Sequence, residues 1–117
     1  MDANSVLIDA LTTYSLNLGD YKVNITVTNN AISKCKDYLS HNPVTTDWMK
    51  RNWSIMSHAV SDYRKFLVGE IHDARNTENN EVLAKLRAEY DILAPYIDLF
   101  KKLSLIHISE PTRPISI

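Results

Sequence analysis

The chain has 117 residues, which is enough for one domain, and 44% of them are hydrophobic while 23% are charged. This composition is too apolar for a disordered protein and is ordinary for a globular one. The formal net charge is −1, so no excess of basic residues points to nucleic acid or to an anionic membrane as the partner.

The sequence also lacks the marks of secretion and of membrane insertion. Cys35 is the only cysteine, so it forms no intrachain disulfide and no cysteine cluster for zinc. The first basic residue is Lys22, after Asp2 and Asp9, which is the wrong charge for a signal peptide. No apolar run approaches the roughly 18 residues that span a bilayer. We therefore expect a cytoplasmic protein.

Helical periodicity marks the first segment. Its apolar residues step by four, three and four: Leu7, Leu11, Tyr14 and Leu18. Gly19 is expected to end this helix, and Asp20 is a candidate cap for the next one.

The second segment admits two interpretations. The stretch "YKVNITV" alternates apolar and polar residues, which is typical of a strand. The wider segment also keeps helical steps of four and three through Tyr21, Ile25, Thr28, Ile32, Cys35 and Leu39. A lone strand would have no partner for its backbone groups. We therefore prefer a helix over 20–40, and leave residues 21–29 open between helix and extended chain.

The third segment carries the clearest pattern. Thr45 or Thr46 can cap it, and its seam is Met49, Trp53, Met56, Val60, Tyr63 and Leu67. Trp48 and Ile55 widen the apolar arc on one flank, together with Ala59 and Phe66, so this helix is expected to contact at least two others. The polar stretch 76–80 indicates a loop.

The last segment repeats the seam through Leu83, Leu86, Tyr90, Leu93, Ile97 and Phe100. Pro95 faces away from this seam and should kink the helix. The sequence therefore predicts an all-α fold: a bundle of about four helices in which residues 46–75 and 79–102 form a long antiparallel hairpin.

The end of the chain has a different character. The string "LSLIHISEPTR", Leu103 to Arg113, resembles the in-frame translation of a transposase-based sequencing adapter. Pro111 and Pro114 also argue against a continuous helix there. We therefore expect residues 1–102 to be a single helical domain truncated at its C-terminus, and residues 103–117 to be a non-native tail.

One basic stripe carries the candidate chemistry. Arg51, His58, Lys65 and His72 are each seven residues apart, which suits either a solvated helix face or a surface for phosphates or an acidic partner. Within it, "RNWSIMSH" resembles the R-x(4–6)-H motif of the HEPN superfamily of helical ribonuclease and nucleotide-binding domains. The resemblance implies that Arg51 stabilises phosphate charge and that His58 acts as acid or base on RNA.

Other site types find little support in the sequence. No set of three or four converging metal ligands can be assembled, and the two glycines, Gly19 and Gly69, allow no phosphate-binding loop. Cys35 lies on a seam and is expected to be a buried hydrophobe. We expect no cofactor and no metal.

The main hypothesis is a structural or protein-interaction module with no catalytic activity, the N-terminal part of a longer protein. Its expected partner is its own missing C-terminal region or another protein subunit, with self-association as a further option and neither nucleic acid nor membrane. Trp48 and Ile55, at the edge of the apolar arc, are the candidate partner-binding residues. The alternative is an RNA-acting domain that uses Arg51 and His58.

Overall fold

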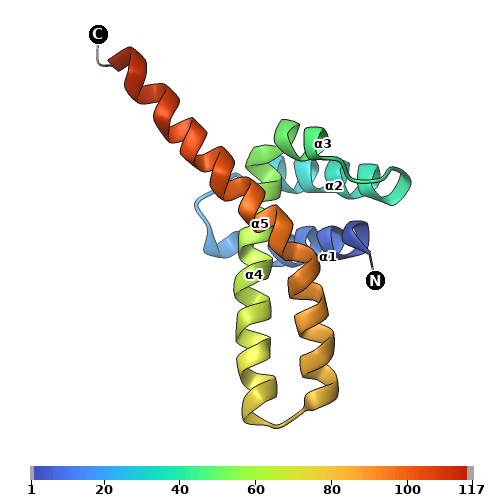
Figure 1. Cartoon of the computed structure of the whole chain (residues 1–117). Coiled ribbons are helices and arrows are strands. Elements are labelled where there is room, and N and C mark those ends of the chain that lie inside the picture. Colours follow the sequence, from blue (N-terminus) through green and yellow to red (C-terminus); the bar gives the residue numbers. More distant parts are fainter. Residues whose placement is uncertain (1, 116–117) are drawn as a thin grey trace.

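The computed structural model describes the backbone of residues 2–115 and the side chains of residues 2–103. Its elements are α1 (Ala3–Leu16), the 3-10 helix η1 (Leu18–Asp20), α2 (Ile25–His41), α3 (Thr46–Arg51), α4 (Trp53–Asn76) and α5 (Asn80–Ile115). None of the residues 2–115 belongs to a strand. The predicted all-α fold and its helical bundle are confirmed (Figure 1).

Short polar side chains begin four of the helices. Each accepts a hydrogen bond from the backbone N–H three residues later, at 2.8 Å for Asp2, 3.0 Å for Asn24, 3.1 Å for Thr45 and 3.2 Å for Asn79. Such a bond satisfies one of the free N–H groups in the first turn. The bond from the N–H of Ser5 also lowers the pKa of Asp2 below its ordinary value. Of the two caps predicted for the third segment, Thr45 is the one used.

The second helix begins later than predicted. Residues 18–20 form a 3-10 turn and Tyr21 is extended, so the predicted cap at Asp20 is wrong and Asn24 takes that role. Within the segment left open, residues 25–29 are helical and residues 21–24 are not. Ile25 is 52% exposed and lies outside the core. The physical reason is that the chain needs several residues to reverse direction between α1 and α2.

The third predicted helix is divided into two. Asn52 has φ −107° and ψ 28°, and it separates α3 from α4. Its side-chain Nδ2 donates to the carbonyl of Trp48 at 2.9 Å. Asparagine competes in this way with the backbone bonds of a continuing helix. The predicted hairpin therefore consists of α4 and the first part of α5, with α3 set apart from it.

The last helix is longer than predicted. α5 continues through Pro111 and Pro114 to Ile115, so the predicted break there is wrong. A proline removes a backbone hydrogen bond, but its fixed φ is itself helical. Figure 1 shows that α5 changes direction along its length, and Pro95 lies near its middle. Residues 116–117 and the side chains of 104–117 lie outside the described part, and the non-native origin of the tail stays a prediction.

Packing is most extensive between α4 and α5, and next between α1 and α4. Figure 1 shows α4 and α5 side by side as a hairpin that extends beyond α1. The largest fully buried side chains come from α1, the turn after it, α3, α4 and α5: Leu7, Leu11, Tyr14, Leu18, Met49, Met56, Leu67 and Leu93. Burying each aliphatic side chain of this kind contributes about 1.5–3 kcal/mol. Within residues 2–115, no helix combines the length and the apolar character needed to cross a membrane.

Candidate functional site

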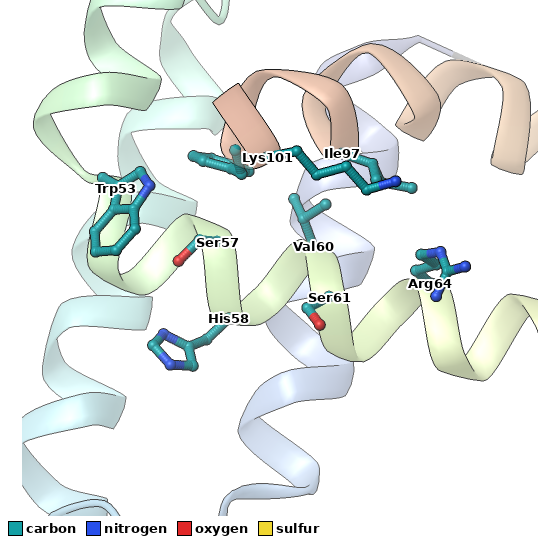
Figure 2. Close-up of a pocket in the computed structure, with 9 residues that line it drawn as sticks. Trp53, Ser57, His58, Val60, Ser61, Arg64, Ile97 and Lys101 are labelled. Atoms are coloured by element: carbon teal, nitrogen blue, oxygen red, sulfur yellow. The ribbon is translucent and has the colours of Figure 1, made fainter. Parts of the chain in front are cut away.

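A groove runs between α4 and α5 and has a volume of about 490 Å³. Its lining combines apolar, hydroxyl and cationic side chains: Trp53, Ser57, His58, Val60, Ser61, Arg64, Ile97, Phe100 and Lys101. Figure 2 shows Trp53 and Arg64 at opposite ends of the groove, with the Lys101 side chain extending from α5 toward α4. None of these nine residues is acidic, so the groove favours an anionic group at its rim.

His58 has a defined tautomer at the edge of this groove. Its Nδ1 lies 2.6 Å from the carbonyl oxygen of Ser54, so Nδ1 carries the proton and donates it. In the neutral ring Nε2 is then the acceptor. The imidazole stacks on the buried ring of Tyr14 at 6.2 Å, with 15° between the ring planes. Figure 2 shows that His58 points away from α5, toward the opposite side of α4 from Lys101.

Arg51 does not line the groove with His58. It is the last residue of α3, and the interruption at Asn52 takes it out of the helical register of α4. Arg51, His58, Lys65 and His72 are all exposed. The cation that shares the groove with His58 on α4 is Arg64. The predicted pair is thus separated by the helix break, and the seven-residue stripe does not form one continuous helical surface.

Trp48 is covered within the chain. It is 6% exposed, and its ring stacks on Tyr38 of α2 with 4.8 Å between centroids and 6° between planes. Ile55 is partly buried beside it, in a shallow hollow of about 300 Å³ that Cys35 also lines. Burial raises the pKa of the Cys35 thiol, which confirms the expected buried cysteine and keeps it in the unreactive form. Trp48 is therefore part of the core, and Ile55 lines an open hollow beside it.

A second groove of about 540 Å³ lies farther along the same two helices. Its lining residues are Val68, Ile71, His72, Arg75, Arg87, Tyr90 and Asp91. Six of the lining residues on α4 fall on one line, because 57, 61, 64, 68, 71 and 75 step by four and three, whereas His58, Val60 and His72 lie beside this line. On α5 the positions 87, 90, 97 and 101 also share a face. The two grooves are parts of one surface.

We call this surface the hairpin face. It consists of Ser57, Ser61, Arg64, Val68, Ile71 and Arg75 on α4, and of Arg87, Tyr90, Ile97 and Lys101 on α5. Four of these ten residues are basic: Arg64, Arg75, Arg87 and Lys101. Asp91 is the one acid among the residues that line either groove. The face is therefore locally basic although the whole chain carries a net charge of −1.

Two carboxylates are buried although nothing in the sequence marks them as buried. Asp62 is 6% exposed and Glu89 is 8% exposed. Asp62 accepts hydrogen bonds from Asn17 and Tyr21, and Glu89 accepts one from Tyr63 at 3.0 Å. Burial and then this bond to Glu89 raise the pKa of Tyr63. Each carboxylate is held by donors from another helix or turn, which gives both a structural role.

Metal binding gains no support within residues described by the structure, where no three His, Cys, Asp or Glu side chains converge. Comparison of the chain with protein-family models, with curated proteins and with solved structures found no match. Function is therefore inferred from the geometry of the hairpin face and of the residues around it.

Proposed function

We propose that this chain is a helical interaction module that binds another polypeptide through the hairpin face. The observation that carries the proposal is the pair of open grooves between α4 and α5, which combine apolar and polar side chains. Val68 lies 47% exposed in this face, without cover from α1, α2 or α3. Grooves between two helices commonly receive a third segment of chain.

The proposed partner is of the type expected from the sequence, but the proposed contact surface is the hairpin face and not the region around Trp48 and Ile55. Trp48 and Ile55 belong to the hollow beside α2, whereas the hairpin face is the larger open surface. The partner is another protein subunit, the region that follows the helical domain, or a second copy of the chain. We propose a cytoplasmic location for the module.

A library of displayed random peptides tests this proposal without assuming the chemistry of the partner. We expect selected peptides to lose binding when Ser61→Trp fills the first groove, because the indole occupies the space between α4 and α5. Ser33→Trp is the matched control, since Ser33 is also an exposed serine on a helix but lies on α2. Peptides that bind both variants equally well would place the binding surface elsewhere and refute the proposal.

A second candidate function is action on RNA, as the HEPN resemblance implies. The observation in its favour is that Arg64 and Lys101, which are phosphate-binding types of residue, line a groove at whose edge His58 lies. The His58 ring points away from Lys101, which weighs against this candidate. The separation of Arg51 from this groove weighs against it. Cleavage of a labelled single-stranded RNA is the test. Activity that is abolished by Arg51→Ala combined with His58→Ala, with helix content unchanged, would favour this candidate.

A further inference from the structure

We propose that the occupant of the hairpin face is an amphipathic helix that carries acidic residues on both flanks of its apolar stripe. This inference rests on the proposed function, and it adds the conformation and the charge of the partner.

The cations of the hairpin face form two pairs, and each pair has one member on α4 and one on α5. Arg64 of α4 and Lys101 of α5 line the first groove, and Arg75 and Arg87 line the second. Each pair thus flanks the crevice between the helices. Asp91, one helical turn after Arg87, is the single acid that lines the second groove, and the first groove has none. Positive charge therefore predominates on both sides of the crevice, which favours acidic residues on both flanks of a partner.

Apolar side chains occupy the floor between these pairs. Val60 and Ile97 line the first groove, and Val68, Ile71 and Tyr90 line the second. An apolar floor with charged edges is the complement of an amphipathic helix. A fully hydrated polyanion would leave these apolar side chains uncovered.

Small residues near the first groove allow a helix to approach closely. Ser57 and Ser61 lie on its α4 side, and Ala94 of α5 falls between Tyr90 and Ile97 on the same helical line. Packed helix axes come within about 8–10 Å of each other, and small side chains at the contact favour the shorter distance. The face can therefore accept a third helix alongside α4 and α5.

The spacing of the cations sets the spacing expected in the partner. Arg64 and Arg75 are eleven residues apart on α4, and Arg87 and Lys101 are fourteen apart on α5. At 1.5 Å per residue these separations are about 16 Å and about 21 Å. In a partner helix, positions eleven or fourteen apart return to nearly the same face. We therefore expect acidic residues at such spacings in the partner.

Binding of two synthetic peptides tests the inference by fluorescence anisotropy. Both peptides have about five helical turns and the same leucine stripe, but one has glutamate flanks and the other has lysine flanks. We expect the glutamate peptide to bind the wild-type chain at least about tenfold more tightly. Equal affinity of the two peptides would overturn the proposal.

Charge reversal of the face supplies the second arm. Arg64→Glu combined with Lys101→Glu should weaken the glutamate peptide by about tenfold or more and strengthen the lysine peptide. Lys22→Glu combined with Lys50→Glu is the matched control, because both lysines are exposed and neither lines the hairpin face. The control should bind both peptides as the wild type does. Equal effects of the two double variants would mean that overall charge governs binding, against the proposal.

A single-stranded RNA oligonucleotide provides the third arm. RNA that binds more tightly than the glutamate peptide, and that loses binding in the Arg64→Glu and Lys101→Glu variant, would assign the face to nucleic acid and overturn this inference. Library peptides that lose binding to the Ser61→Trp variant but carry no acidic residues beside their apolar stripe would also overturn this inference. The proposed interaction module would then still stand. The two proposals can therefore fail separately.

Discussion

The phenol of Tyr21 donates a hydrogen bond of 2.5 Å to the buried carboxylate of Asp62. Asn17 donates a second bond to the same carboxylate through Nδ2, at 3.1 Å. Asp62 lies in the middle of α4, whereas Asn17 and Tyr21 flank the 3-10 turn between α1 and α2. A single carboxylate therefore fixes the point at which the chain leaves α1, and with it the position of α2 on the bundle.

Removing the Tyr21 hydroxyl should destabilise the fold. We expect Tyr21→Phe to lower the free energy of unfolding by about 1–3 kcal/mol, because the buried carboxylate loses one of its two donors. Urea denaturation followed by circular dichroism measures the change. Tyr38→Phe is the control, since it retains the ring that stacks on Trp48 and should change stability by less than about 0.5 kcal/mol. Equal effects of the two variants would contradict a special role for Tyr21.

The same bond should make the fold sensitive to alkali. The hydrogen bond to Asp62, followed by burial, raises the pKa of Tyr21 from 10.0 to about 12. The folded state therefore favours the neutral phenol, and this contribution is fully present below pH 10 and is lost as the pH rises through about 12. We expect the free energy of unfolding to fall over this range more steeply in the wild type than in Tyr21→Phe. Parallel curves for the two proteins would refute the assignment.

The bond between Tyr63 and Glu89 joins α4 to α5 in the core of the hairpin. Tyr63→Phe alone leaves a buried carboxylate without this donor, which should cost about 1–3 kcal/mol or more. Tyr63→Phe combined with Glu89→Met replaces both partners by apolar groups and should recover much of the loss. Thermal unfolding of the single and double variants measures this coupling. A double variant less stable than the Tyr63→Phe single variant would contradict the prediction.

Asn4 links the start of the chain to the end of α2. Its Nδ2 donates to the carbonyls of Leu39 and Asn42 at 2.8 and 2.7 Å, and its Oδ1 accepts from the N–H of Val44 at 3.1 Å. We expect Asn4→Ala to cost about 2–4 kcal/mol, because three hydrogen bonds are lost and a partly buried loop is released. Hydrogen exchange at Val44 should also accelerate. Asn30→Ala, at an exposed helical position, should be neutral or slightly stabilising.

The stacked pair of Tyr38 and Trp48 should act as part of the core. Trp48→Ala is expected to lower the free energy of unfolding by about 3–5 kcal/mol, as for other buried aromatic residues. Ile55→Ala should cost less, because Ile55 is only partly buried. Chemical denaturation of both variants checks the order. A stable Trp48→Ala protein that loses affinity for selected peptides would instead restore Trp48 as a partner-binding residue.

Helical periodicity was enough to predict the all-α fold and much of the buried face of α4 and α5. Of the predicted seams, Trp53, Leu83, Tyr90 and Ile97 are only partly buried. The steps of three and four correctly predicted that Met56, Val60 and Tyr63 on α4, and Leu86, Leu93 and Phe100 on α5, would be buried, and all six are at most 8% exposed. This was predictable because helical periodicity depends on residues three and four apart, which any sequence displays directly. The position of the cap at Thr45 is local in the same way.

Which residues meet across helices follows from the packing of the helices and cannot be predicted from periodicity. Asp62 and Glu89 look like surface residues in the sequence, and they are buried because tyrosines from elsewhere in the chain reach them. Arg64 and Lys101 line the same groove because α5 folds back along α4. Arg51 does not line it, because the helix breaks at Asn52. Such pairings depend on contacts between residues 26 to 45 positions apart, as for Tyr63 with Glu89 and Asn17 with Asp62. Local periodicity carries no information at that distance, so the hairpin face emerges only when the helices pack.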